Sequence, residues 1–129
     1  MVTRLTTRSV AGRPLWRLAA ELETVLEQHQ EGSAENWWTV AQLRPALEHA
    51  LDLLLTVATE IGVDEPGARS ALATRDAVEI HLRAAADIEA ADARTEVFTK
   101  VLVDAARLVI QEAAAHTTAD RATTSRRQA

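Results

Sequence analysis

The second half of the chain contains no glycine and no proline from Ala68 to the C-terminal residue, Ala129. Glycine and proline are the strongest markers of turns, so their absence over this stretch argues against an architecture of short strands and tight turns. Residues that favour helices, such as alanine, leucine, glutamate and arginine, dominate the composition, and tyrosine is absent. We therefore expect an all-α fold, in the form of an up-and-down antiparallel four-helix bundle.

The chain length predicts one domain. A chain of 129 residues, of which 47% are hydrophobic, can bury one core and has no room for a second. Residues 1–13 and 117–129 show no apolar periodicity, so we expect a flexible basic N-terminal segment and a disordered C-terminal tail around a bundle domain of residues 14–116. From apolar spacing, the four helices are expected at about residues 14–31, 39–61, 68–86 and 93–116.

Local signals indicate where these helices begin and end. Pro14 is placed to open the first helix, because the missing N–H of a proline costs no hydrogen bond in the first turn. Pro45 lies inside the second expected helix, where it removes one backbone hydrogen bond and favours a bent entry. Gly62, followed by the run 64–67, is the clearest break in the chain and predicts a C-cap and then a turn.

The division between the third and fourth helices rests on periodicity alone. At ~100° per residue, the apolar faces of residues 71–86 and 97–113 point roughly half a turn apart, so one straight helix would have to bury opposite sides. We place the break at residues 87–92, with Asp92 as the N-cap of the fourth helix. One bent helix over residues 68–116 is the alternative.

The net charge of −5 is unevenly distributed. Residues 1–20 carry +4 and residues 117–129 carry +2, which leaves −11 for residues 21–116. Basic ends of this kind are typical of arms that contact phosphate or the acidic surface of another protomer, and also of solvated tails. The weak candidates for anion or nucleic-acid contact are Arg4, Arg8, Arg13 and Arg17.

Motifs of known catalytic and metal sites are missing from the sequence. The chain has no cysteine, which excludes disulfides and thiolate chemistry. None of the four histidines belongs to the Glu-x-x-His or His-x-x-x-His spacing of metal-binding helices, and Glu112 with His116 forms an isolated pair. A glycine-rich phosphate loop and a nucleophile elbow are also absent. We expect surface histidines, no enzyme activity, no metal and no cofactor.

Composition also bears on origin and location. Thirteen of the fourteen basic residues are arginine, which together with abundant alanine is typical of a GC-rich bacterial genome. The most apolar stretch, residues 47–61, is interrupted by charged residues and is shorter than the roughly 20 apolar residues that a membrane span needs. The N-terminus lacks the apolar core of a secretory signal. We expect a cytoplasmic protein without membrane contact.

Two apolar features predict a binding surface. The pair Trp37-Trp38 stands at a helix entry, where it is either an aromatic hot spot or a staple for the connecting loop. The second and fourth helices carry apolar faces wider than one stripe, which indicates either a close central pairing or a surface for self-association. The candidate interaction residues are Trp37, Trp38, Leu53, Val57, Val103 and Ile110.

These observations favour a non-catalytic protein–protein interaction module, such as an adaptor, an antitoxin-like partner or an assembly factor. We expect it to self-associate as a homodimer through the wide apolar faces of the second and fourth helices. The alternative is a small-ligand-binding or nucleic-acid-associated regulator, which would use a pocket between helices or the arginine-rich N-terminal arm. As partner we expect a second copy or another protein, in preference to nucleic acid.

Overall fold

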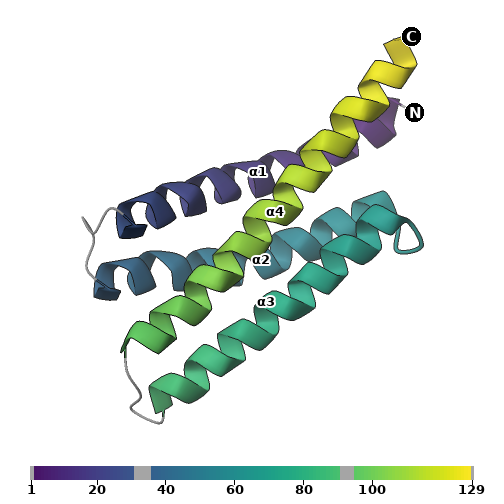
Figure 1. Ribbon diagram of the computed structural model, residues 1–129. Helices are drawn as coiled ribbons and strands as arrows, with labels where there is room; N and C mark the ends of the chain where they lie inside the picture. The colour runs from purple at the N-terminus through teal and green to yellow at the C-terminus, as the bar shows by residue number, and fades with distance from the viewer. Residues whose placement is uncertain (1, 31–35, 91–94, 129) are drawn as a thin grey trace.

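The chain forms a four-helix bundle, as the sequence predicts (Figure 1). The structure is a computed structural model that describes the backbone of residues 2–30, 36–90 and 95–128, and the side chains of residues 13–30, 38–88 and 97–116. The helices alternate in direction, and no strand occurs in these ranges. Their bounds are α1 Val2–Gln30, α2 Asn36–Ile61, α3 Pro66–Ala90 and α4 Thr95–Gln128.

The packing of the four helices is uneven. Helices α2 and α4 each pack against all three of the others, whereas α1 and α3 do not approach each other closely within the described ranges. The pair α2 and α4 therefore forms the short diagonal of the bundle. A helix on the short diagonal buries more of its circumference than a helix at a corner. The wide apolar faces of α2 and α4 are therefore explained by the packing of these two helices against each other and against both α1 and α3 within one chain.

The core is built from large side chains on three helices and small ones on the fourth. Fully buried leucines come from α1, α2 and α4, whereas the buried face of α3 consists mainly of alanines around Val78. Small side chains allow α3 to approach its neighbours closely. The largest fully buried side chains are Leu15, Leu22, Leu43, Leu47, Leu54, Leu102, Val78, Val109 and Thr39.

The first and last helices are longer than expected. Helix α1 begins at Val2 rather than at Pro14, and α4 continues to Gln128 rather than ending at His116. The expected boundaries are wrong because a proline inside a helix removes only one hydrogen bond, and weak apolar periodicity does not end a helix. Whether these ends behave as flexible tails stays a prediction, since a helical backbone does not measure motion.

The inner boundaries also shift by a few residues. Helix α2 begins at Asn36, three residues before the expected start, and α3 spans Pro66–Ala90, so residues 87–90 are still helical. Helix α4 begins at Thr95, and the chain therefore divides into two helices here, as the change of apolar phase predicts. The expected N-cap, Asp92, lies outside the described residues.

The turn between α2 and α3 follows the expected pattern. Gly62 has a φ of 110°, in the left-handed region that favours glycine, and its N–H donates to the carbonyl of Ala58 at 3.0 Å. The N–H of Glu65 then donates to the carbonyl of Gly62, also at 3.0 Å. Within the described part of the chain, no helix is long and apolar enough to cross a membrane.

Candidate functional site

A cleft of about 440 Å³ lies between the C-terminal end of α1 and the first half of α4. These helices pack against each other in opposite directions, so residues near position 30 meet residues near position 103. The volume lies within the range of small-molecule sites and is also sufficient for a large side chain from a partner. Its lining residues are His29, Gln30, Thr99, Lys100, Val103, Asp104 and Arg107.

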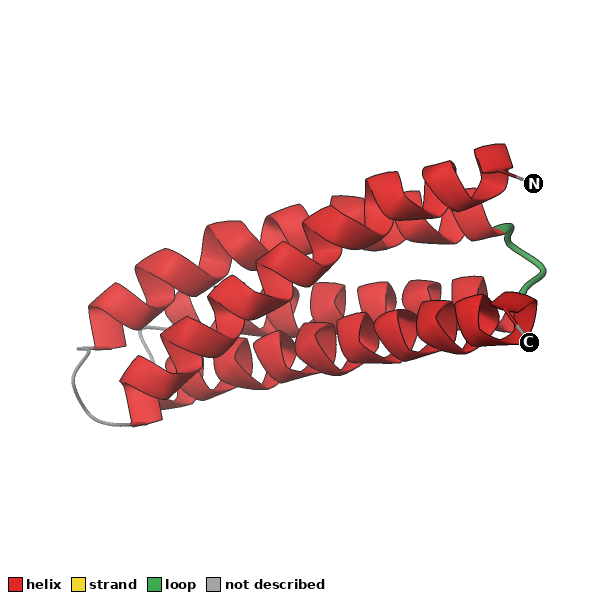
Figure 2. Cartoon of the chain, turned by 90° about the horizontal axis from the view of Figure 1, so that it is seen from above, coloured by secondary structure: helices red, strands yellow, loops and turns green. Residues whose placement is uncertain are grey.

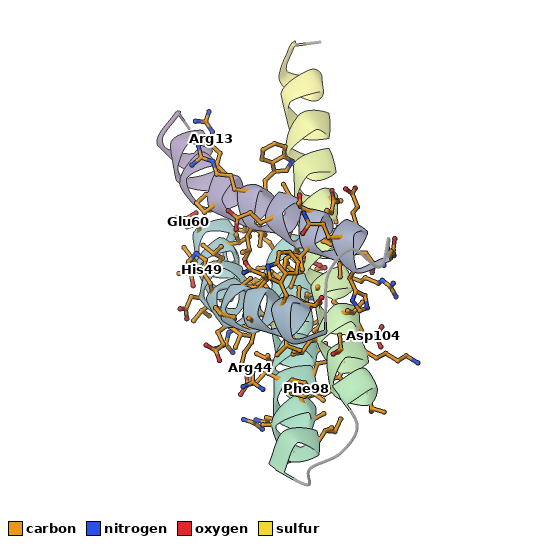
Figure 3. All side chains as sticks on the ribbon, turned by 90° about the vertical axis from the view of Figure 1, so that its left-hand side faces the viewer. Arg13, Arg44, His49, Glu60, Phe98 and Asp104 are labelled. Atoms are coloured by element: carbon orange, nitrogen blue, oxygen red, sulfur yellow. The ribbon has the colours of Figure 1, made fainter. Side chains whose placement is uncertain are left out.

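The α4 side of the cleft has a buried floor and a charged rim. Thr99 and Val103, one helical turn apart, are 2% and 6% exposed. Lys100, the only lysine of the sequence, is exposed. The guanidinium of Arg107 lies 3.7 Å from the carboxylate of Asp104, which Figure 3 labels on α4. Both side chains are about half exposed, so this ion pair is weak and the rim remains open to a partner.

The α1 side of the cleft is fixed by a contact with α2. His29 Nδ1 and the hydroxyl of Thr39 lie 3.3 Å apart, within hydrogen-bond distance. Thr39 is 0% exposed, so this contact lies at the edge of the core. It limits rotation of the imidazole ring and gives the cleft a preformed wall.

Trp16 lies on the flank of α1 that also carries Gln30, one of the two α1 residues that line the cleft. At ~100° per residue, positions 16 and 30 differ by roughly 40°, so Trp16 and Gln30 lie on one flank of the helix. The helical rise separates them by about 21 Å along the axis. The Trp16 side chain is 57% exposed, an unusual state for the largest apolar residue. The flank of α1 that carries Gln30 thus also carries an exposed indole ring.

A buried polar cluster joins α3 to α4 near the other end of the bundle. Glu112 is 6% exposed, and its Oε1 accepts hydrogen bonds from the hydroxyls of Ser70 at 2.7 Å and Thr74 at 3.0 Å. Its Oε2 lies 2.6 Å from Nε2 of His116, whose side chain is only 14% exposed. The expectation that His116 lies at the surface is therefore wrong.

The carboxylate of Glu112 is the centre of this cluster. Here both hydroxyls and the imidazole contact the carboxylate of Glu112, in separate hydrogen bonds. Among the described residues, no three His, Cys, Asp or Glu side chains gather closely enough to hold a metal ion.

The candidate interaction residues from the sequence do not form one surface. Val57 and Val103 are buried in the core at 4% and 6% exposure, and Leu53 and Ile110 are half-buried and pack against it. The bundle itself thus buries much of these four side chains, and of the four only Val103 lines the cleft. Trp38 is half-buried, and the side chain of Trp37 lies outside the described residues.

The structure describes the side chains of two of the four candidate arginines. Arg13 and Arg17 are exposed on α1, whereas the side chains of Arg4 and Arg8 lie outside the described residues. Trp16 is not among the sequence candidates, although one signal was present. It stands beside the buried leucine stripe of α1, which consists of Leu15, Leu18, Leu22 and Leu26, rather than within it, and this position places a large apolar ring toward solvent.

No family model, curated protein or solved structure matches the chain. The function must therefore be inferred from the residues and geometry of this chain itself.

Proposed function

We propose that this chain is a non-catalytic interaction module that self-associates as a homodimer through the side formed by α1 and α4. The proposal is supported by one observation above all: exposed Trp16 and the cleft at Gln30 lie on one flank of α1. In a two-fold symmetric dimer, each surface meets the same surface of the partner in the opposite direction. A two-fold axis midway between Trp16 and the cleft would place each indole ring in the partner's cleft.

Exposed apolar side chains elsewhere do not offer a comparable surface. Leu55, Val63, Ile80 and Val97 belong to α2, the α2–α3 turn, α3 and α4, respectively. Isolated apolar residues on the surface are ordinary and need no partner. None of these four residues lines the described cleft. Trp16 differs from them by its size and by the hollow on the same side of the bundle.

The chemistry of the cleft suits an indole ring. Val103 provides an apolar part of the floor beside Thr99, and Lys100 and Arg107 provide cations at the rim that can interact with the face of an aromatic ring. Tryptophan and arginine are the residues most enriched at interface hot spots. Burial of the exposed part of Trp16 contributes about 3 kcal/mol per ring from apolar area alone, and the interface contains two such rings.

Tryptophan fluorescence tests this arrangement directly. The double variant Trp37→Phe and Trp38→Phe leaves Trp16 as the sole tryptophan of the chain. We expect its emission to shift to shorter wavelength as the protein concentration rises, because the ring moves from water into the partner's cleft. An emission maximum that stays at the solvent-exposed value at every concentration contradicts the proposal.

Matched variants separate a specific contact from general surface hydrophobicity. Trp16→Ala is expected to raise the dimer dissociation constant by at least tenfold, measured by sedimentation equilibrium. Ile80→Ala removes a side chain that is 64% exposed on α3 and should leave that constant within twofold. Equal effects of the two variants would contradict the assignment of the interface.

A second candidate function follows from the basic rim of the cleft. Lys100, Arg107 and His29 line a volume of the size of small-ligand sites, although Asp104 also lines it and pairs with Arg107. Titration calorimetry with inorganic phosphate and with a dicarboxylate tests this alternative. Binding that is lost in Lys100→Ala favours a ligand-binding protein, whereas the absence of heat with both probes favours the dimer.

A further inference from the structure

The fold brings the two basic ends of the chain to one end of the bundle. Figures 1 and 2 show the N-terminus of α1 and the C-terminus of α4 at the same end, although they are separated by almost the whole sequence. Asp120 is the sole acidic residue of helical segments 2–13 and 117–128. The arginines of these segments, hereafter the basic pole, are Arg4, Arg8, Arg13, Arg121, Arg126 and Arg127.

The C-terminal part of this pole extends past α3. Glu112 of α4 contacts Ser70 of α3, and α3 begins only four residues before Ser70, at Pro66. The part of α4 beyond His116 therefore continues past the start of α3 for about 18 Å, at the rise of an α-helix. Figure 3 shows this part of α4 projecting from the rest of the bundle. The backbone of this part of α4 is therefore not covered by α3.

Four arginines elsewhere in the bundle have partners within the chain, whereas exposed Arg69 of α3, like Arg13 and Arg17, has no side-chain partner among the described residues. Arg75 and Arg83 both pair with the carboxylate of Glu79, at 3.7 and 2.7 Å. Arg107 pairs with Asp104, and Arg44 lies 5.0 Å from the centroid of the Phe98 ring. The bundle therefore uses its own acidic and aromatic groups to engage these four guanidinium groups.

Arg13 and Arg17 differ from those four arginines. Both are exposed on α1, and neither has an ion pair, hydrogen bond or ring contact in the part of the chain that the structure describes. Figure 3 shows Arg13 near the N-terminal end of α1. A guanidinium group without an internal partner keeps its five N–H donors for an external anion. Within the described side chains, Arg13 is therefore available to an external anion.

We propose that the basic pole binds the phosphate backbone of double-stranded nucleic acid. Arginine matches phosphate through paired N–H donors, and the projecting end of α4 together with the N-terminal part of α1 places arginines from both ends of the sequence at one end of the bundle. The screening length of about 8 Å at physiological salt separates this pole from most of the acidic body. Asp64 and Glu65 lie on the α2–α3 turn at the same end of the bundle and limit the affinity. The site goes beyond the proposed function, because it uses neither Trp16 nor the cleft.

Fluorescence anisotropy with a labelled 20-base-pair DNA duplex tests this inference on the full chain. Binding to phosphates releases counterions, so the affinity should fall steeply between 50 and 200 mM salt. The N-terminal double variant Arg4→Ala and Arg8→Ala and the C-terminal double variant Arg126→Ala and Arg127→Ala should each lower the affinity by at least tenfold. Each should also reduce the slope of log affinity against log salt by about 2.

The double variant Arg75→Ala and Arg83→Ala is the matched control. It removes the same charge from the α3 surface, where both arginines pair with Glu79. This control should bind the duplex as the wild type does, and circular dichroism checks that all three variants remain folded. Equal weakening by the control would show a general charge effect and overturn the proposal.

Two further outcomes also contradict the proposal. One is the absence of binding at 50 mM salt up to about 100 μM protein, a range in which non-specific DNA binders associate. The other is salt-sensitive association of the protein with itself, without DNA, that both terminal double variants abolish. That result would show that the basic pole contacts the acidic body of a second copy.

Discussion

The imidazole of His116 lies 2.6 Å from the carboxylate of Glu112, one helical turn earlier on α4. The same carboxylate accepts hydrogen bonds from Ser70 and Thr74, so one buried acidic group connects α3 with α4. The buried face of α3 consists largely of alanines, which fit against a neighbouring helix in several registers. A buried polar group with defined partners can select one register among them. We infer that Glu112 sets the relative position of α3 and α4.

Substitution of Glu112 tests this role. Glu112→Ala removes the acceptor for two hydroxyls and the partner of His116, so we expect a loss of about 2–4 kcal/mol in the free energy of unfolding. Urea denaturation at pH 7 measures it. Glu79→Ala, which breaks two surface ion pairs on α3, should cost less than about 1 kcal/mol. Similar losses for both variants would contradict a special role for the buried carboxylate.

Two glycines near the α2–α3 turn provide a matched test of backbone conformation. Gly62 has a φ of 110°, which is unfavourable for any residue with a Cβ atom, so Gly62→Ala should destabilise the fold by about 1–2 kcal/mol. Gly67 lies in α3, and an added Cβ would meet its nearest neighbours at an ordinary 3.6 Å. Gly67→Ala should therefore stabilise the protein by about 0.5–1 kcal/mol. Thermal denaturation checks this contrast: the melting temperature should fall for Gly62→Ala and rise for Gly67→Ala.

The short diagonal of α2 and α4 predicts where the core is most sensitive. Leu102 is 0% exposed on α4, and Leu102→Ala should cost about 3–5 kcal/mol of stability through cavity formation. Leu55 of α2 is 45% exposed, and Leu55→Ala should cost less than about 1 kcal/mol. Chemical denaturation measures the free energy of unfolding of the two variants. A small loss for Leu102→Ala would place this residue outside a close-packed core.

Much of the fold follows from local patterns in the sequence. The signals for the turn after Gly62 act over a few residues, and the structure confirms this turn. The separation of α3 from α4 follows from the phase of apolar residues, because a straight helix cannot bury two opposite faces. The start of α1 at Val2 could not be predicted in this way, since residues 2–13 lack the apolar repeat that marks a helix. From these residues alone, Pro14 indicates the first turn of a helix, whereas in the structure it lies in the interior of α1.

The candidate sites depend on contacts between residues that are distant in the sequence. Glu112 and His116 can be recognised as a pair because they are one turn apart, whereas Ser70 and Thr74 are about forty residues earlier and join them only in the folded chain. The cleft likewise needs the packing of α1 on α4. The wide apolar face around Val57 allowed two interpretations, and only the arrangement of all four helices shows that this residue is buried within the bundle.

The proposed dimer is tested most directly by the mass of the protein in solution. Light scattering coupled to size-exclusion chromatography gives this mass without reference to molecular shape. We predict a mass of twice 14.0 kDa for the wild-type chain at micromolar concentration, and a mass close to 14.0 kDa for Trp16→Ala under the same conditions. A wild-type mass of 14.0 kDa at every concentration up to the millimolar range would contradict the dimer and with it the proposed function.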